Sequence, residues 1–340
     1  MLFEILKKNE WVEILSEIEN YDCYHTYDYH AINRKPDEKG VLLVYRSSDI
    51  LIALPLLIRP IEGTSYFDAT SVYGYSGPIF KSFSTAMDLS DFQQSLYNYF
   101  KDQKIISVFS RLNPFIENQI SILKNIGNVE ALSDVVNIDL TKDIDIQRQL
   151  FSKTTKRYLN KVRKLCYTKK STSQEDILTF VDLYYENMNR VQAKDSYYFE
   201  KDYFFNMIDS KDFTTEVIFA IMNETDEIIS AAMIMRTNDI IQYHISGTKN
   251  DYLHLTPIRL LLDETRISGT KENYKYFNLG GGLGSESDSL LYFKSSFSKD
   301  FKKFNVWKYI VDHDIYDSLT LKNNQQKIDN NFFPLYRYKG

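Results

Sequence analysis

The spacing of apolar residues in the first 145 positions predicts both β-strands and α-helices. Two adjacent runs, 41–45 and 50–58, are separated by four polar residues and predict a β-hairpin. Before them, helical spacing places four apolar side chains on one face: Trp11, Ile14, Leu15 and Ile18. Further elements are expected as helices at 92–99 and 116–126 and as strands at 105–109 and 135–140. This part of the chain therefore mixes helices with a largely antiparallel sheet.

The remaining residues repeat this pattern. Helices are expected over 154–166 and 174–190, followed by strands with short turns at 215–222, 228–235 and 240–246. The next helix is predicted to have Thr256 as its cap and Pro257 at its first position. A strand at 276–279, a helix at 288–297, a strand at 304–311 and a C-terminal helix complete the series.

Because this order of elements occurs approximately twice, we predict an α+β protein with two similar domains, 1–145 and 146–340. Each domain would contain a mixed, mostly antiparallel sheet flanked by helices. With 340 residues, 43% of them hydrophobic, the chain can bury a large core and is long enough for two domains.

Charge and composition narrow the function classes. The formal net charge of -5 argues against a general polyanion binder, so we expect no DNA partner. Two cysteines and five histidines lack the spacing of metal ligands, and we expect no metal site. Neither a signal-peptide core nor an apolar run of about 18 residues occurs, which predicts a cytoplasmic protein.

The most informative segment is the strand at 276–279, which ends in three glycines: Gly280, Gly281 and Gly282. Glycines at that point predict a bare backbone turn before the next helix. Ser285 or Ser287 can cap that helix, and Asp288 would lie in its first turn, where the helix dipole favours a carboxylate.

Lys294 falls about two turns into this helix, beside three aromatic residues: Tyr292, Phe293 and Phe297. A glycine-lined site with one lysine suits the binding and polarisation of a carbonyl group. A tight turn with a solvated lysine fits the same residues. A dinucleotide-binding βαβ unit ending at Asp312 is a further alternative, but Ser285 stands where its third glycine belongs.

A second feature is the stretch 153–170, which carries eight lysines and arginines and no acidic residue. In helical spacing Tyr158, Val162 and Leu165 form an apolar stripe, so the cations occupy the other faces. Phosphates of a coenzyme, a sugar nucleotide, a tRNA or a lipid headgroup are the expected ligands, bound by Lys156, Arg157, Lys161, Arg163 and Lys164. The alternative is a solvated helix face, although such faces usually mix both signs.

A third feature is the loop Tyr73-Gly74-Tyr75-Ser76-Gly77-Pro78, with Asp68 just upstream. The backbone and the rings of such a loop can both contact a ligand, although a turn with packed aromatics is the commoner structure. Arg111 follows the predicted strand at 105–109 and lies at its end.

Together these residues resemble the Fem-type branch of the GNAT acyltransferase superfamily, whose members carry two GNAT domains in tandem. The resemblance rests on short motifs in a fixed order: Tyr-Gly-Tyr-x-Gly-Pro at 73–78, the basic helix, Tyr243-His244, Pro257-x-x-Leu-Leu, Leu-Gly-Gly-Gly at 279–282 and Phe293-Lys294. It spans nearly the whole chain and implies two tandem GNAT-like domains.

The resemblance also implies transfer of an acyl or aminoacyl group to an amine. In the peptidoglycan enzymes of this branch, a lysine at the Phe-Lys motif is proposed to stabilise the tetrahedral oxyanion, and Lys294 matches it. Attack requires a deprotonated amine, for which His244 or Asp288 would serve. The remaining expected substrate contacts are Asp68, Tyr73, Tyr75, Arg111, Tyr243, Asn278, Gly280, Gly281, Gly282 and Phe293.

Two departures from the family leave the donor open. There is no room for the long helical arm that Fem aminoacyltransferases often insert, and residues 247–256 lack the pyrophosphate-binding loop of ordinary GNAT enzymes. We therefore expect no tightly bound cofactor, and either acyl-CoA or aminoacyl-tRNA as the donor.

The leading hypothesis is an N-acyl- or aminoacyltransferase acting on a cell-envelope precursor, either a peptidoglycan stem or an amino sugar of a surface polysaccharide. The acceptor would be a small molecule or lipid-linked, and contacts with tRNA and with the inner face of the membrane stay open. The competing hypotheses are a non-catalytic module that binds a glycan or sugar nucleotide, and an RNA-binding protein that uses the basic helix.

Overall fold

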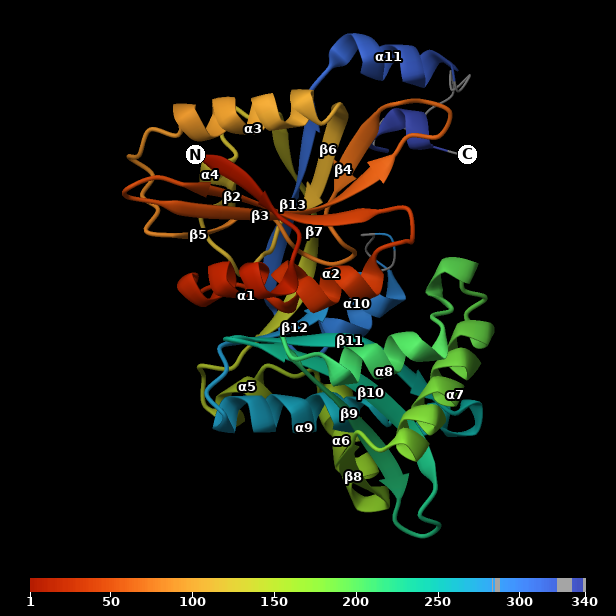
Figure 1. Cartoon of the computed structure of the whole chain (residues 1–340). Helices are drawn as coiled ribbons and strands as arrows, with labels where there is room; N and C mark the ends of the chain where they lie inside the picture. The colour runs from red at the N-terminus through yellow and green to blue at the C-terminus, as the bar shows by residue number, and fades with distance from the viewer. Residues whose placement is uncertain (283, 285–287, 323–331, 339–340) are drawn as a thin grey trace. The chain divides into compact units, whose positions relative to one another are not determined.

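The computed structural model describes residues 1–282, 284, 288–322 and 332–338 (Figure 1). It divides into two compact units: unit 1 comprises Met1–Leu132 and Lys303–Gly340, and unit 2 comprises Ser133–Lys302. The last residues of the chain therefore pack with the first ones, and the tandem-domain boundaries 1–145 and 146–340 stay a prediction. Among the residues described, no helix is both long enough and apolar enough to cross a membrane.

Unit 1 contains a mixed sheet with helices. Its elements are β1 (Leu2–Ile5), α1 (Lys8–Glu17), α2 (Tyr27–Asn33), β2 (Lys39–Arg46), β3 (Leu51–Pro60), β4 (Phe67–Thr70), β5 (Ile79–Lys81), α3 (Ser90–Asp102), β6 (Ile105–Arg111), α4 (Gln119–Ile122) and α11 (His313–Lys322). The chain passes between the units within β7 (Asn128–Asp139) and β13 (Asp300–Ile310).

The strands of unit 1 follow the order β1-β2-β3-β4-β6-β13, and β5 also pairs with β3. The β4–β6 pair is parallel, whereas the other pairs are antiparallel. The predicted hairpin is confirmed, since β2 and β3 pair from Lys39↔Ile58 to Arg46↔Leu51. Strand β13 enters this sheet because residues 306–310 pair with β6, which explains why the C-terminal segment belongs to unit 1.

Unit 2 has the same kind of architecture. Its elements are α5 (Ile144–Gln149), α6 (Lys153–Leu165), β8 (Cys166–Ser171), α7 (Gln174–Arg190), α8 (Lys201–Asp209), β9 (Thr214–Met222), β10 (Ile228–Thr237), β11 (Ile240–Thr248), α9 (Ile258–Lys271), β12 (Tyr276–Gly280) and α10 (Ser289–Lys294). Its strands follow the order β7-β12-β11-β10-β9-β8. The β11–β12 pair is parallel and the others are antiparallel.

Two glycines of unit 2 show which helices cover each face of its sheet. A Cβ on Gly269 of α9 would lie 2.4 Å from Cδ1 of Ile241, so this helix packs tightly on one face. A Cβ on Gly247 of β11 would lie 2.3 Å from the carbonyl oxygen of Leu183, so α7 packs on the opposite face. The main apolar core of unit 2 lies on the first face and includes Leu159 of α6.

The predicted α+β class with mixed, mostly antiparallel sheets is confirmed, but two local predictions are wrong. The helix expected at 116–126 is reduced to α4, because Asn118 before it and Asn125 after it adopt left-handed backbone conformations. Thr256 does not cap α9: it too is left-handed, with φ 50°, its hydroxyl has no hydrogen-bond partner in the described part of the chain, and Pro257 stands at the cap position instead of the first helical one.

Candidate functional site

Strands β11 and β12 of unit 2 separate toward the ends at which they finish. Their parallel ladder runs from Ile240↔Tyr276 to Gln242↔Asn278, yet β11 continues to Thr248 and β12 to Gly280. Beyond that point the two strands no longer form backbone hydrogen bonds with each other. The separated strand ends lie beside the glycine turn, where the sequence predicts the site.

A β-bulge in β11 sets the directions of the side chains at this point. Ile234 of β10 faces Tyr243 and Met233 faces Ile245, which leaves His244 as the extra residue. The bulge brings Tyr243 and Ser246 to the same face, and their hydroxyl oxygens are 2.5 Å apart. Tyr243 packs against the core on the α6 and α9 face.

Lys294 lies on that face as well. Its side chain is buried, with 8% of the residue exposed, and Nζ donates a hydrogen bond of 2.7 Å to the carbonyl of Gly281. Nζ is also 5.9 Å from the centroid of the Tyr243 ring. The structure therefore brings together Lys294, Tyr243 and the glycine turn, and it excludes the alternative of a solvated lysine.

Burial sets the proton affinity of this lysine. Loss of hydration lowers the pKa of Lys294 to about 8, although the nearby Asp288 carboxylate partly opposes the change. Among the described residues, Lys294 has no ion pair. At pH 7 the group is therefore mostly an ammonium ion, with the Asp288 carboxylate nearby but no ion pair to any described residue.

Glycine is required at two of the three predicted positions. Gly280 has a left-handed φ of 79°, and a Cβ there would lie 3.1 Å from Nζ of Lys294. A Cβ on Gly281 would lie 2.9 Å from the carbonyl oxygen of Asp134. Gly282 is half-buried in the same turn. Asp288, rather than a serine, caps α10 by accepting a bond from the amide of Leu291, while Ser285 and Ser287 lie outside the described residues.

His244 points away from the Lys294 side of the sheet. Its Nε2 lies 2.6 Å from the hydroxyl of Tyr203 on α8, and Phe199 stacks on the Tyr203 ring at 4.2 Å. Burial lowers the pKa of His244 to about 4, so the imidazole is neutral at pH 7. Lys294 and His244, the two predicted catalytic residues, thus lie next to the same strand separation. The Tyr243 ring is near Lys294, and the Tyr203 hydroxyl contacts His244.

The other predicted contacts in unit 2 take different positions. The amide of Asn278, which is 1% exposed, donates to Gln242 at 2.8 Å and accepts from the Gly280 amide at 2.8 Å. Asn278 therefore fixes the end of β12 from within the protein. Phe293 is half-buried, and its ring centroid is 4.7 Å from Cζ of Arg259.

In unit 1 the predicted site residues differ in how far they are exposed. Asp68 is fully buried; its carboxylate accepts from Arg59 Nε at 2.7 Å, and it is also bound by Arg337. Tyr73 is 59% exposed, and Cζ of Arg111 lies 5.8 Å from its ring centroid. Tyr75 is half-buried, and burial raises its pKa to about 12. Of these four residues of unit 1, Tyr73 and Arg111 together present a ring and a cation toward the surface.

Sequence reasoning missed the residues that shape the loop at 73–78. Asn113 donates to the Asp22 carboxylate at 2.9 Å and to the Tyr75 carbonyl at 3.0 Å. Gln119 donates to the carbonyls of Ser76 and Pro78. Asn113 lies 91 positions from Asp22, and no local pattern marks such a pair.

The predicted phosphate-binding cations of helix α6 differ in whether they have a carboxylate partner. Arg163 pairs with Asp263 at 2.7 Å and with Glu264 at 2.5 Å, so its charge is compensated. Lys156 donates to the Gln149 carbonyl, Arg157 lies over the ring of Tyr158, and Lys161 and Lys164 are exposed. In the part of the chain that the structure describes, these last four have no carboxylate partner and can meet a phosphate.

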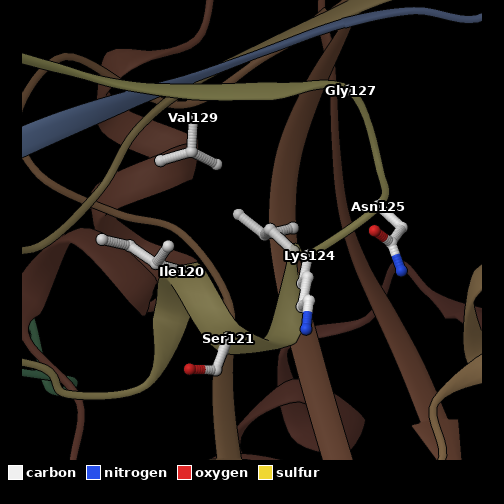
Figure 2. Close-up of a pocket in the computed structure, with 7 residues that line it drawn as sticks. Ile120, Ser121, Lys124, Asn125, Gly127 and Val129 are labelled. Carbon is white, nitrogen blue, oxygen red and sulfur yellow. The ribbon is translucent and has the colours of Figure 1, made fainter.

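A separate hollow of about 230 Å³ lies in unit 1, near α4 and the start of β7 (Figure 2). It is lined by Ile120, Ser121, Leu123, Lys124, Asn125, Gly127 and Val129. None of the predicted site residues lines it.

No protein-family model and no curated protein sequence matches the chain. Among solved structures, FemX superposes with a TM-score of 0.73 at 11% identity, covering 93% of this chain and 99% of FemX. A conserved protein of unknown function from Bacteroides thetaiotaomicron gives 0.60 at 12% identity, covering 91% and 100%. The C-terminal domain of a putative lysylphosphatidylglycerol synthetase from Agrobacterium fabrum gives 0.55 at 14% identity, covering 94% and 96%. At these identities the likeness concerns the fold.

Proposed function

We propose that this chain, which has a Fem-like GNAT fold, is an N-acyl- or aminoacyltransferase that forms an amide bond on a cell-envelope precursor. One observation carries the proposal: Lys294 is buried at the point where β11 and β12 separate, and among the residues that the structure describes it has no ion pair. The sequence motif predicted a lysine with this role, and its burial is the physical condition under which such a charge stabilises an oxyanion most strongly.

The proposed reaction begins when the acceptor amine attacks the carbonyl carbon of the activated donor. A C–N bond forms, and the electron pair of the C=O bond moves to oxygen. Lys294 already donates one hydrogen bond to the Gly281 carbonyl, and its ammonium has two further hydrogens for the oxyanion. Collapse of the intermediate breaks the C–O or C–S bond to the leaving group, which takes up a proton.

His244 is our candidate for accepting the proton of the amine. Its neutral imidazole has the correct charge state, and Tyr203 holds its Nε2. A pKa of about 4 makes it a weak base, so we assign it the role of passing the proton on rather than holding it. Asp288 is not assigned this role, because its carboxylate caps α10.

The envelope precursor is proposed from the known proteins with the same fold. FemX and the domain of a putative lysylphosphatidylglycerol synthetase are the named examples. We propose a peptidoglycan stem or an amino sugar as the acceptor, acyl-CoA or aminoacyl-tRNA as the donor, and a location at the inner face of the membrane. The Tyr73–Arg111 pair of unit 1 stays a proposed substrate contact by itself, since it presents a ring and a cation.

The test is product formation followed by mass spectrometry. The purified chain is given acetyl-CoA or charged tRNAs together with peptidoglycan stem peptides or amino-sugar nucleotides. Replacement of Lys294 by alanine should lower kcat about 10²- to 10³-fold, which is the effect of removing one oxyanion donor. Lys294→Arg, which keeps the positive charge, serves as the matched variant. Unchanged turnover in Lys294→Ala would disprove the catalytic role, and ligand binding without product for every donor would favour a binding module.

A further inference from the structure

Two buried amides occupy facing positions on β11 and β12. Gln242 and Asn278 are partners in the parallel ladder between these strands, so both side chains project from the same face of the sheet. They are 2% and 1% exposed, and Nδ2 of Asn278 donates to Oε1 of Gln242 at 2.8 Å. The adjacent residues on the two strands, Ile241, Phe277 and Leu279, belong to the apolar core. Buried amides cost free energy of folding unless they are hydrogen-bonded, so their partners explain why they are there.

The Asn278 side chain completes a β-bulge near the end of β12. The ladder with β7 shifts its register between Asn278 and Gly280, which leaves Leu279 as the extra residue. At this bulge the Gly280 amide donates to Oδ1 of Asn278 at 2.8 Å, two positions earlier in the chain, as in an Asx-turn. A backbone N–H requires an oxygen, so Nδ2 of Asn278 must face Gln242.

The bend that follows holds Lys294. Gly280 is left-handed, with φ 79°, and the carbonyl of Gly281 accepts from Nζ of Lys294 at 2.7 Å. A Cβ on Gly280 would lie 3.1 Å from the same nitrogen, so the bare backbone lies close to the ammonium. A series of hydrogen bonds therefore runs from Gln242 through Asn278 and the two glycines to Lys294.

We infer that Asn278 and Gln242 are positioning residues for the Lys294 ammonium. Asn278 fixes the bend by holding the Gly280 amide, and Gln242 keeps the Asn278 side chain in the orientation that this bond requires. Both residues act through Lys294 and not on the reacting atoms. A displacement of about 1 Å in a catalytic group can cost about 10²-fold in rate, so the place of Nζ matters. This catalytic consequence rests on the proposed function, whereas the positioning itself does not.

The first measurement needs no substrate. The folded full chain carries isotope-labelled lysine, Lys294→Met assigns the Lys294 resonance, and NMR follows its titration. Asn278→Ala leaves the Gly280 amide without its partner, so the bend should loosen and admit water to Nζ. The pKa of Lys294 should then rise from about 8 toward the ordinary 10.5, because burial is the leading cause of its depression. Gln242→Leu should cause a smaller rise, since the bond between Asn278 and Gly280 remains.

The matched control is Asn137→Ala in β7. Asn137 faces Asn278 in the ladder and is fully buried, but its amide donates to Asp300 at 2.7 Å instead of holding the bend. Its replacement should leave the pKa of Lys294 unchanged. Asn278→Ser is the conservative variant, because a hydroxyl can accept from the Gly280 amide more weakly. It should restore part of the depression of the Lys294 pKa that Asn278→Ala removes.

The second measurement is kinetic. Asn278→Ala should lower kcat roughly 10- to 100-fold and leave KM nearly unchanged, because the ammonium acts in the transition state. In the Lys294→Ala background the same substitution should lower kcat no further, since its effect passes through Lys294. A further loss there would mean that Asn278 acts through the fold in general and would overturn the inference.

Two results of the titration would also overturn it: an unchanged pKa of Lys294 in Asn278→Ala, or an equal rise in Asn137→Ala. If circular dichroism shows Asn278→Ala to be unfolded, Asn278→Ser and Gln242→Leu supply the titration, and an unchanged pKa in both contradicts the positioning. If the pKa rises as expected but Lys294→Ala keeps its turnover, the positioning stands and the proposed catalytic function fails.

Discussion

Asp68 in unit 1 and Lys294 in unit 2 are both buried, but they differ in how their charge is compensated. In unit 1 the buried Asp68 carboxylate is held by Arg59 and Arg337, so its charge is compensated from within. In unit 2 Lys294 is more than nine-tenths buried and has no ion pair within the described residues. An uncompensated buried charge costs free energy of folding unless a ligand or a reacting group uses it. The difference favours a structural role for Asp68 over its predicted contact with the acceptor, and it favours a functional role for Lys294.

The largest expected effect would test this contrast through stability. Asp68→Ala should lower the free energy of unfolding by roughly 2–3 kcal/mol, because it leaves two partly solvated arginines unpaired. Lys294→Met should cause no comparable loss, since Lys294 has no ion pair within the described residues. Urea unfolding measures both, with the exposed Asp37→Ala as the control in unit 1. An equal loss in the two variants would contradict the comparison.

The glycine turn gives the next effect. Gly280→Ala should cost about 1–2 kcal/mol for its left-handed backbone and should also lower turnover, because the new methyl group would displace Nζ of Lys294. Gly284 is the matched control: its φ is also positive, at 61°, but a Cβ there would have no neighbour within 4 Å among the described residues. Gly284→Ala should therefore lose similar stability and keep its activity. If both variants lose activity equally, the close approach to Lys294 is not responsible.

A pH profile would sharpen the contrast further. Because burial lowers the pKa of Lys294 to about 8, kcat should fall roughly tenfold per pH unit above pH 8, as the ammonium loses its proton. The free energy of unfolding should rise over the same pH range in which kcat falls. Between about pH 8 and the ordinary lysine pKa of 10.5, the unfolded chain binds more protons than the folded one, so folding becomes more favourable as the pH rises.

The matched variant for this profile is Lys294→Arg, whose guanidinium stays charged across the range. Any activity that it retains should show no decline near pH 8. A decline at the same pH in both proteins would assign the titration to another group.

The smallest effect concerns the Tyr243 hydroxyl. Tyr243→Phe should lose about 1 kcal/mol of stability, because Ser246 loses its partner at 2.5 Å, while the ring stays beside Lys294. Ser246→Ala should lose a similar amount, and the double variant should lose less than the sum of the two. Turnover should change little in all three. A large loss of activity in Tyr243→Phe would instead place the hydroxyl in the reaction.

Much of the fold could be predicted because periodicity is a local signal. The β2–β3 hairpin and the helices α6 and α7 appear where apolar spacing placed them. Lys294 could also be located, since a strand, a glycine turn and an aromatic helix follow one another directly. The helix expected at 116–126 failed for a local reason too: asparagines accept left-handed conformations that periodicity does not register.

The rest depends on contacts between residues far apart in the sequence. Arg337 reaches Asp68 across 269 positions, and Arg259 contacts Thr155 across 104. Such long-range pairs decide whether a buried charge has an ion-pair partner. The sequence alone therefore cannot show that Asp68 has such partners and that Lys294 has none among the described residues. Pairing of β13 with β6 likewise assigns the C-terminal residues to unit 1, which no run of apolar residues indicates.

The extra residue in β11 has a consequence for how the chain tolerates change in length. Since Ile234 faces Tyr243 and Met233 faces Ile245, a chain lacking only His244 would join those partners into an uninterrupted ladder, and every later side chain would keep its face. Folding alone does not demand this histidine. Its removal would instead deprive Tyr203 of a partner and straighten the strand at the place where a substrate amine is expected to arrive.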